Sequence, residues 1–425
     1  MGYLLALFLI VVTALPLAAQ NATTPRARQV AADVRVLAAD SLGGRKTCQP
    51  GNVAAAAYLG RALARIGARP AGDGAGFAEA WTTGSTSGTR EAGIADCRTA
   101  NVVGMLPGRG VLAGQYVIVG AHFDHLGTGR FGSLASDSGQ IHNGADDNAS
   151  GTAAVLEIAR IVARDRARRD SRPRRAVVFA LWSGEEEGSL GSAWYAGHLP
   201  MPKDSIAAYL NFDMVGRLRD RKLLALGSRT AAEWPALLDS VNAAYHLDLR
   251  ASGDGWGPSD HASFYAQKIP VLHFFTDLHE DYHRPSDDAD KINADGIVTV
   301  ADFAGALIRR MDALPGRLTF VDVPPPAMPA NAGSGRPRPT LGTIPDMASE
   351  PGGVLLSGVR TGSAADSGGL RAGDILVGIG ADSVGNLQDF QNALMNHAAG
   401  DSVEVRYKRG GQLVRVMVRL GGRTN

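Results

Sequence analysis

QYVIVGAHFDHLG, residues 115–127, begins as a continuous apolar run and ends in histidines and an aspartate. A second segment, RRAVVFALWSGEEEG at 174–188, has the same form, with glutamates after its apolar run. Short apolar runs without alternation are typical of strands that are covered on both faces. Further strand candidates are TANVVGMLPG (99–108), AAYLNFDMVGR (207–217) and IPVLHFFTD (269–277). Together these segments predict a buried β-sheet.

Segments with helical spacing of their apolar residues lie between the predicted strands. The clearest of them cover residues 151–167, 231–245 and 296–314. Strands that alternate with helices in this way favour a mostly parallel sheet between two layers of helices. We therefore predict an α/β fold, a three-layer α/β/α sandwich. Ligands of such folds bind beyond the carboxyl ends of the strands.

The composition is that of an ordinary globular protein. The chain has 425 residues, of which 45% are hydrophobic and 20% are charged, and its formal net charge is +1. This length favours two or three domains. The near-neutral charge gives no reason to expect nucleic acid or an anionic membrane as a partner.

The N-terminus has the pattern of a secretory signal. An apolar run is followed by Pro16 and by small residues at Ala18 and Ala19, so we expect residues 1–19 to be a signal peptide and the protein to be periplasmic or secreted. Because no Lys or Arg precedes the apolar run, an uncleaved membrane anchor is the alternative. Cys48 and Cys97 are the two cysteines, and in an exported chain they suggest one disulfide. Two unpaired buried thiols are the alternative here.

A change of composition divides the chain. Residues 321–337 are rich in Pro, Ala and Gly and have no apolar period, as in a semi-rigid linker. They separate a large domain, expected over 25–320, from a segment at 338–421 with its own strand and helix patterns. That segment ends in a predicted hairpin, in which two alternating runs flank Gly410 and Gly411.

Side chains that can bind a metal follow several of the predicted strands and loops. They are His122 and Asp124, Asp146 and Asp147, Glu185 to Glu187, Asp213, and His283. Each motif alone has an ordinary explanation, such as a histidine with its hydrogen-bond partner or a solvated acidic loop. All of them, however, fall on the edge where a sheet of this kind binds ligands. Imidazole and carboxylate suit zinc, a shared carboxylate can hold two ions, and one further carboxylate can move a proton.

These motifs resemble those of a known family. AHFDHLG, NGADDNASG, SGEEEGSLGS, NFDMVGR and YHRPSDD match, in order and spacing, the di-zinc aminopeptidases of the bacterial leucyl aminopeptidase and aminopeptidase Y type (metallopeptidase clan MH). The resemblance covers residues 25 to 315. It implies the zinc exopeptidase fold, with a mixed central sheet, and two Zn²⁺ ions per chain.

The resemblance also assigns roles to the motif residues. His122 and Asp213 would bind one zinc, Glu186 and His283 the other, and Asp147 would bridge both. Glu185 would be the general base and Asp124 the acid that fixes the tautomer of His122. The extra acid Glu187 leaves a one-residue shift open, in which base and ligand exchange. Asp146 is expected to shape the loop, and a cis bond is expected between Asp147 and Asn148.

Other residues near the motifs receive weaker assignments. Asp260 and His261 match a recurring Ser-Asp-His element, for which a pocket-forming or supporting role is favoured over metal ligation. His125 and His142 are interpreted as ordinary loop residues and His273 as a core residue. Trp256, Phe264 and Tyr265 are candidates for the substrate pocket, and packing in the core is the alternative.

The activity implied by the resemblance is hydrolysis of N-terminal residues from peptides. The attacking water would bridge the two zinc ions and give its proton to Glu185, which would pass it to the leaving amine. The partners would be peptides with a free N-terminus.

The segment GSAADSGGLRAGDILVGIGADSVGNLQDFQNAL (362–394) resembles a PDZ domain. Its carboxylate-binding loop would be Leu341, Gly342, Thr343 and Ile344, and it would bind a peptide terminus while the peptide adds as a strand. A packing module without a peptide ligand is the alternative.

Two rival functions remain open. A carboxypeptidase or dipeptidase on the same scaffold would need a cationic cluster for the substrate carboxylate, for which Arg217 and Arg284 are candidates. A non-catalytic peptide-binding protein is the rival from another class, and retention of every ligand position argues against it. A glutaminyl cyclase uses a single zinc, so the complete ligand set argues against that activity too.

Overall fold

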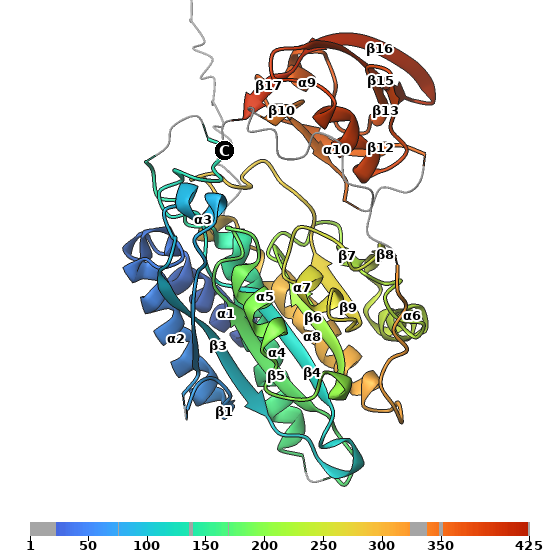
Figure 1. Ribbon diagram of the computed structural model, residues 1–425. Helices are drawn as coiled ribbons and strands as arrows, with labels where there is room; N and C mark the ends of the chain where they lie inside the picture. The colour runs from blue at the N-terminus through green and yellow to red at the C-terminus, as the bar shows by residue number, and fades with distance from the viewer. Residues whose placement is uncertain are drawn as a thin grey trace, which may run out of the picture.

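The computed structural model describes residues 23–423 except 75, 136–138, 169, 324–337 and 348–351. The expected signal peptide and most of the expected linker lie outside these residues. A large α/β domain occupies 23–323, and a smaller, mainly β domain occupies 338–423 (Figure 1). No helix among the described residues is both long enough and apolar enough to cross a membrane.

One sheet of the large domain holds nine strands in the order β1-β3-β5-β4-β6-β9-β7-β8, and β2 pairs with β3 beside this path. Its strands are β1 (Arg69–Pro70), β2 (Ala78–Thr82), β3 (Arg98–Leu106), β4 (Tyr116–His122), β5 (Ala176–Trp182), β6 (Ile206–Phe212), β7 (Lys222–Leu226), β8 (Asp248–Ser252) and β9 (Val271–Phe275). The central strands β5, β4, β6 and β9 are parallel, whereas β3 and β7 pair antiparallel to this centre. The predicted mixed sheet with a parallel centre is confirmed.

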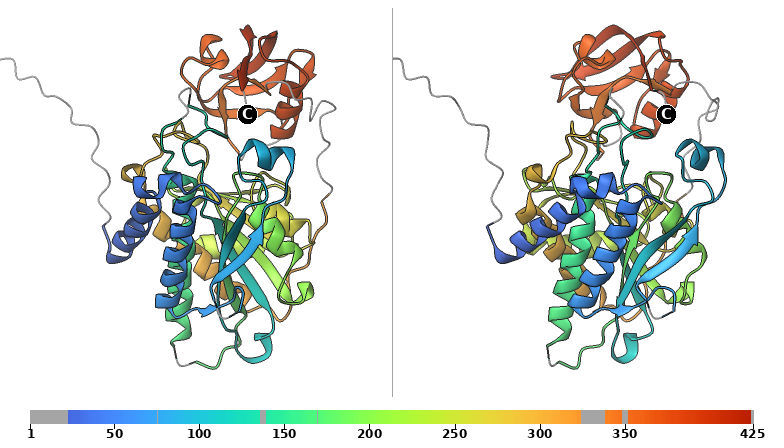
Figure 2. Two further views of the ribbon diagram at one scale, coloured as in Figure 1. Left: turned by 60° about the vertical axis from the view of Figure 1, so that its left-hand side comes forward. Right: turned by 90° about the vertical axis from the view of Figure 1, so that its left-hand side faces the viewer.

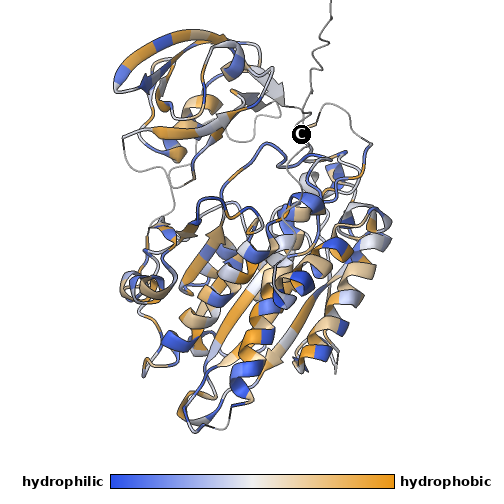
Figure 3. Ribbon diagram, turned by 180° about the vertical axis from the view of Figure 1, so that it is seen from behind, coloured by the Kyte–Doolittle hydropathy of each residue, from blue (hydrophilic) through white to orange (hydrophobic). Residues whose placement is uncertain are grey.

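Helices cover both faces of the sheet. One layer consists of α1 (Pro25–Leu37), α2 (Pro50–Ile66), α4 (Gly151–Arg166), α6 (Trp234–Tyr245) and α8 (Ala294–Met311), whose apolar residues join the largest core cluster. The opposite layer consists of α5 (Leu190–Gly197) and α7 (His261–Tyr265), which pack on the other face through Tyr195 and Phe264. A short helix, α3 (Ser87–Glu91), lies outside these layers. Figure 3 shows the apolar strands between helices whose outer faces are polar, so the predicted three-layer sandwich is confirmed.

The strand β5 shows why the sheet forms here. All of its residues are buried, because helices cover both of its faces. Its alternate side chains pack into different clusters, with Val177 and Phe179 on one face and Val178 and Ala180 on the other. A run with no polar position fits only such an environment.

A disulfide ties the loop before α2 to the strand β3 region. It joins Cys48 to Cys97, whose Cα atoms are 6.3 Å apart. The loop that it holds contains the buried Arg45.

The small domain is an antiparallel sheet in the order β11-β12-β13-β15-β16, and β14 pairs with β13. Its elements are β10 (Arg338–Thr340), β11 (Thr343–Pro345), β12 (Val354–Val359), α9 (Ala364–Ser367), β13 (Ile375–Ile379), β14 (Asp382–Ser383), α10 (Leu387–Met395), β15 (Ser402–Arg409), β16 (Gln412–Arg419) and β17 (Gly421–Arg423). The predicted hairpin joins β15 to β16, and Gly410 and Gly411 both have positive φ, as its two-residue turn requires.

The small domain lies above the carboxyl ends of the central strands (Figure 2). Polar and apolar contacts join it to the large domain there. The Lys222 Nζ atom donates to both Asp277 and Asp346 at 2.8 Å, and Met347 packs against the apolar cluster that contains Phe275.

Candidate metal centre

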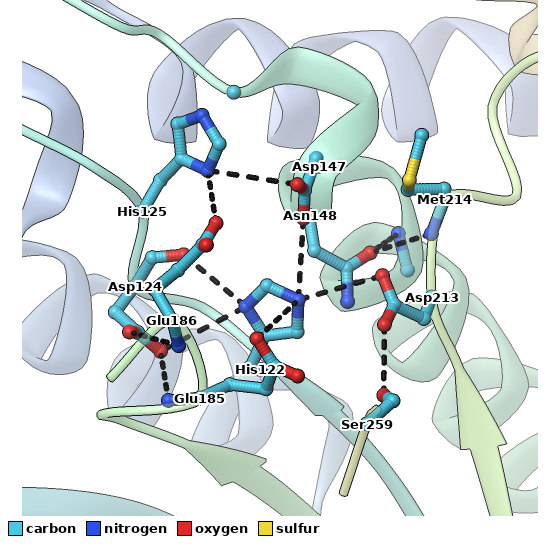
Figure 4. A network of polar contacts seen from close by, with 12 residues as sticks. His122, Asp124, His125, Asp147, Asn148, Glu185, Glu186, Asp213, Met214 and Ser259 are labelled. Atoms are coloured by element: carbon cyan, nitrogen blue, oxygen red, sulfur yellow. Dashed lines mark hydrogen bonds and ion pairs between the residues drawn. The ribbon is translucent and has the colours of Figure 1, made fainter. Parts of the chain in front are cut away.

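The candidate ligands meet because the central strands run in the same direction. β4 ends at His122, Asp213 directly follows β6, and the acidic turn at 185–187 follows β5. The carboxyl ends of parallel strands lie at one edge of the sheet, so residues distant in the chain converge there. Figure 4 shows Asp147 and Asp213 pointing toward His122.

The converging side chains form two triads that share one residue. His122 Nε2 lies 3.3 Å from Asp147 Oδ1 and 3.4 Å from Asp213 Oδ1. His283 Nε2 lies 3.2 Å from Asp147 Oδ2 and 3.2 Å from Glu186 Oε2. Each oxygen of Asp147 therefore faces a different triad. Ligand atoms of His122, Asp147 and Glu186 all lie within 4.8 Å of one another.

The second nitrogen of each histidine faces a main-chain oxygen. His283 Nδ1 lies 2.9 Å from the oxygen of Gly132, and His122 Nδ1 lies 3.3 Å from the main-chain oxygen of Asp124. Both contacts leave Nε2 directed at the triads. The Asp124 carboxylate is 3.8 Å from His122 Nδ1 and accepts hydrogen bonds from the main-chain N–H groups of Glu185 and Glu186. Asp124 therefore holds the acidic turn as well as facing His122.

The three glutamates of the acidic turn point in different directions. Glu186 reaches His283, and Glu185 Oε2 lies 3.9 Å from His122 Nε2. The Glu187 carboxylate instead lies 3.9 Å from Lys46 Nζ, and burial raises its pKa to about 8. Glu187 is therefore turned away from both triads.

Glu185 belongs to neither triad and lies in a low-dielectric, negatively charged environment. Burial raises the pKa of its carboxyl well above its usual range, and the neighbouring Asp260 and Asp213 add to this shift. Burial also raises the pKa of Asp260 to about 7. A carboxylate in such a place binds a proton readily, as a general base must.

The two adjacent acids of the 145–150 loop have different partners. Asp146 Oδ1 accepts hydrogen bonds from Ser150 Oγ at 2.8 Å and from the Gly216 N–H at 2.7 Å. The other oxygen of Asp146 faces His279 Nε2 at 3.1 Å. Both carboxylate oxygens of Asp146 thus contact other groups of the protein, whereas each oxygen of Asp147 is directed into one of the two triads. The Asp147–Asn148 peptide bond is cis, as predicted.

His125, interpreted from the sequence as an ordinary loop residue, lies inside the site, and that interpretation is wrong. Its side chain is fully buried, and its Nδ1 lies 2.6 Å from Glu186 Oε1, the oxygen that does not face His283. The position of His125, three residues after His122, was the only signal in the sequence. His142 instead bonds to Ser133 Oγ and the Gln140 main-chain oxygen within its own loop.

Replacing His125 with alanine is expected to weaken the binding of one metal ion by about ten- to a hundredfold. The reason is that Glu186, a candidate ligand, loses the histidine that contacts its carboxylate. Titration of the metal-free protein against a competing chelator measures this affinity. His142→Gln, in the same loop, is the matched control and should keep both affinities. Equal affinities in His125→Ala and the wild type would show that His125 does not orient Glu186.

Arg45 is a second residue that sequence reasoning missed. It is fully buried, and its guanidinium donates to the main-chain oxygens of Phe123, Leu37, Asn143 and Gly144. Burial lowers its pKa to about 10. Three of these oxygens, those of Phe123, Asn143 and Gly144, belong to the chain just after His122 and just before Asp147, so Arg45 joins the two loops that carry those residues.

The candidate pocket residues divide into two groups. Asp260 and His261 are buried, and the His261 ring stacks on His273 with ring centroids 4.6 Å apart. His273 Nδ1 in turn lies 2.9 Å from Asn211 Nδ2. Phe264 and Tyr265 belong to the core under α5 and α7, and Trp256 packs on Tyr265. The aromatic residues therefore contribute to packing, as the alternative interpretation of the sequence expected.

The donor atoms fit zinc. Each triad offers one imidazole nitrogen and two carboxylate oxygens, a ligand set that Zn²⁺ uses in catalytic sites with a further position open. Asp213 Oδ1 is buried and has no hydrogen-bond partner among the described residues, as expected for an atom reserved for a cation. The fit holds for both triads, because Asp147 presents one oxygen to each.

Comparison with protein families agrees with this geometry. Residues 101–308 match the model described as Peptidase family M28, and residues 339–420 match that of the PDZ domain. The larger domain belongs to peptidase family M28. The smaller domain is a PDZ domain, as its sequence predicted.

Several curated proteins are similar to the M28 domain. Leupeptin-inactivating enzyme 1 of Streptomyces exfoliatus is 31% identical over 176 residues, 41% of this chain and 35% of that protein. A probable aminopeptidase of Saccharomyces cerevisiae is 32% identical over 151 residues, 35% of this chain and 39% of that protein. The match thus spans less than half of the length of these relatives.

Solved structures share the fold of the M28 domain. A Zn-dependent exopeptidase from Parabacteroides distasonis superposes with a TM-score of 0.55 at 18% identity, covering 68% of this chain and 99% of that one. A leucine aminopeptidase precursor from Bacteroides thetaiotaomicron gives 0.54 at 18% identity, covering 68% and 98%. At these identities the likeness concerns the fold alone.

Proposed function

We propose that this protein is an exported zinc aminopeptidase that hydrolyses N-terminal residues from peptides. The observation that carries the proposal is the pair of triads that share Asp147, with Glu185 beside them and outside both. Membership of family M28 and the aminopeptidase names of several relatives support it.

The triads would hold two zinc ions. His122 and Asp213 would bind one ion, Glu186 and His283 the other, and Asp147 would contact both. Bound zinc supplies a Lewis acid for the scissile carbonyl and makes a water molecule acidic near neutral pH.

Glu185 would move the proton during hydrolysis. Its carboxylate would accept a proton from the attacking water and give it to the leaving amine. Burial of the Glu185 carboxyl raises its pKa, which makes the carboxylate a stronger proton acceptor. Asp124 would keep Glu185 in place through the hydrogen bond from the Glu185 main-chain N–H.

One candidate cation for binding a substrate carboxylate is already engaged. Arg217 is paired with Asp281 at 3.2 Å and with Asp287 at 3.1 Å. The Asp287 carboxylate in turn accepts a hydrogen bond from the main-chain N–H of Asp147. Arg217 thus supports the metal-binding loop, which weakens the carboxypeptidase alternative.

Export and peptide binding by the PDZ domain are parts of the same proposal. Export rests on the N-terminal sequence, which lies outside the described residues, and is supported by the Cys48–Cys97 disulfide, a bond typical of oxidising compartments. Peptide binding rests on the general behaviour of PDZ domains, which add a peptide to a sheet edge.

Hydrolysis of amino-acid p-nitroanilides tests the function. We expect release of p-nitroaniline to fall at least about a hundredfold after treatment with a chelator and to return with Zn²⁺, since the metal supplies the Lewis acid. N-acetylated versions of the same substrates serve as the matched control and should remain intact. Chelator-sensitive cleavage of the N-acetylated substrates alone would contradict the aminopeptidase assignment.

A further inference from the structure

The contact between the PDZ domain and the M28 domain lies beside the candidate metal centre. Lys222 Nζ bridges Asp277 of the M28 domain and Asp346 of the PDZ domain, and the Asp277 carboxylate also accepts from Ser357 Oγ at 3.3 Å and from the Met347 N–H at 3.4 Å. Asp277 is buried, two residues after the end of β9. Ion pairs and hydrogen bonds therefore hold the PDZ domain at the edge of the sheet where the candidate metal centre lies.

Apolar contacts extend this junction toward the metal centre. Met347 packs in a cluster with Met214, Phe275 and Tyr282. The ring of Tyr282 lies 3.9 Å, between centroids, from the ring of His283, a candidate ligand. Tyr282 thus links the apolar cluster that Met347 joins to the candidate ligand His283.

The strand β11 is an edge strand that leads to this junction. It pairs with β12 on one side and ends the order of the PDZ sheet, so its other side can accept an added strand. β11 is followed directly by Asp346 and Met347, the residues that contact the M28 domain. The helix α10 packs near β10 and lies on the side of the PDZ domain that faces the M28 domain (Figure 1).

The direction of a bound peptide follows from this arrangement. The carboxylate-binding loop of the PDZ domain precedes β11, at Leu341 and Gly342. A peptide whose C-terminus lies at that loop and which pairs with β11 must run antiparallel to it. Its N-terminal part therefore points toward Asp346 and Met347, and from there toward His283.

A cation lies at the PDZ end of this path. A cavity of about 310 Å³ beside the loop is lined by Leu341, Gly342, Ser363 and Arg419, and Arg419 places a positive charge there. A positive charge at this place suits the C-terminal carboxylate of a bound peptide.

We propose that the PDZ domain and the M28 domain bind the two ends of the same substrate, so that the preferred substrates are peptides with both termini free. This inference rests on the proposed aminopeptidase function. An extended peptide that runs from Gly342 to Met347 covers about 17 Å at about 3.3 Å per residue and must continue past Tyr282 to reach His283, so only peptides of about eight or more residues are expected to reach both sites.

A series of peptides with one N-terminal sequence tests the proposal in the full-length, zinc-loaded protein. The peptides range from three to fifteen residues and are made both as C-terminal acids and as C-terminal amides. For lengths above about eight residues we expect kcat/KM of the acid to exceed that of the amide by about tenfold or more, because the second site raises the local concentration. For three-residue peptides the acid and the amide should be hydrolysed equally.

Variants on one strand locate the carboxylate site. Arg419→Glu should reduce the acid-to-amide ratio of a ten-residue peptide to about one. Arg415→Glu is the matched control on the same strand, because Arg415 pairs with Glu404 away from the cavity, and it should keep the ratio. An acid-to-amide ratio near one at every length in the wild type would overturn the proposal, while hydrolysis of the short peptides would leave the aminopeptidase function standing. Loss of hydrolysis of every free-amine peptide would instead refute that function.

Discussion

Replacing Glu185 with alanine is expected to lower kcat by about three orders of magnitude while two zinc ions stay bound. Glu185 lies beside His122 but belongs to neither triad, so its loss removes the proton acceptor and leaves the ligand atoms in place. General base catalysis contributes about 10²- to 10⁴-fold to such reactions. The measurement is kcat on an amino-acid p-nitroanilide together with the zinc content of the dialysed protein.

The adjacent glutamates supply the controls for this experiment. Glu186→Ala should lose one zinc ion, because Glu186 faces His283 in a triad. Glu187→Gln should keep both ions and most of the activity, because Glu187 is turned toward Lys46. Loss of an ion from Glu185→Ala, together with retention of both by Glu186→Ala, would show that the roles of the two residues are exchanged.

Replacing Arg45 with alanine is expected to lower the free energy of unfolding by at least about 3 kcal/mol, since several buried oxygens lose their donor at about 1–3 kcal/mol each. The guanidinium satisfies main-chain oxygens from the loops after His122 and before Asp147. Without it, those oxygens stay buried and unpaired, and both loops lose their common anchor. Urea unfolding at a fixed free zinc concentration measures the change.

Two further variants make the Arg45 experiment specific. Arg45→Lys keeps the charge but cannot reproduce the planar array of donors, so its loss of stability should be intermediate. Arg35→Ala, at an exposed position on α1, should change stability by less than about 0.5 kcal/mol. A loss in Arg45→Ala no larger than that in Arg35→Ala would mean that the Arg45 hydrogen bonds do not stabilise the fold.

The centre of the fold was predictable because the central strands are buried on both faces. A run such as AVVFALW in β5 has no polar position, and this pattern occurs only where helices cover both sides. The strands β7 and β8, which lie toward one edge of the sheet, were not predicted. β8, Asp248–Ser252, is mostly exposed and carries charged residues, so its sequence has no clear strand pattern.

The candidate site was predictable where the side chains follow strand ends and less so elsewhere. His122 and Asp213 could be placed because parallel strands end at one edge. His125 and Arg45 could not, because their roles depend on contacts across the fold. Arg45 reaches Gly144, 99 residues away, and nothing near Arg45 in the chain marks it as buried. The contact of Asp277 with Met347 depends in the same way on how two domains meet.

The shared position of Asp147 has a consequence for the lifetime of the protein. Asp147 is buried between His122 and His283, within a group of carboxylates that repel one another when ionised. A cation can bind this group of side chains only in the folded chain, so its binding stabilises the fold. The stabilisation is about 2.7 kcal/mol when the free ion concentration is a hundred times the dissociation constant. Zinc supply would then set how much folded protein persists, as well as how fast each molecule works. A shortage of zinc would reduce the amount of the protein through unfolding and degradation, in addition to reducing its activity.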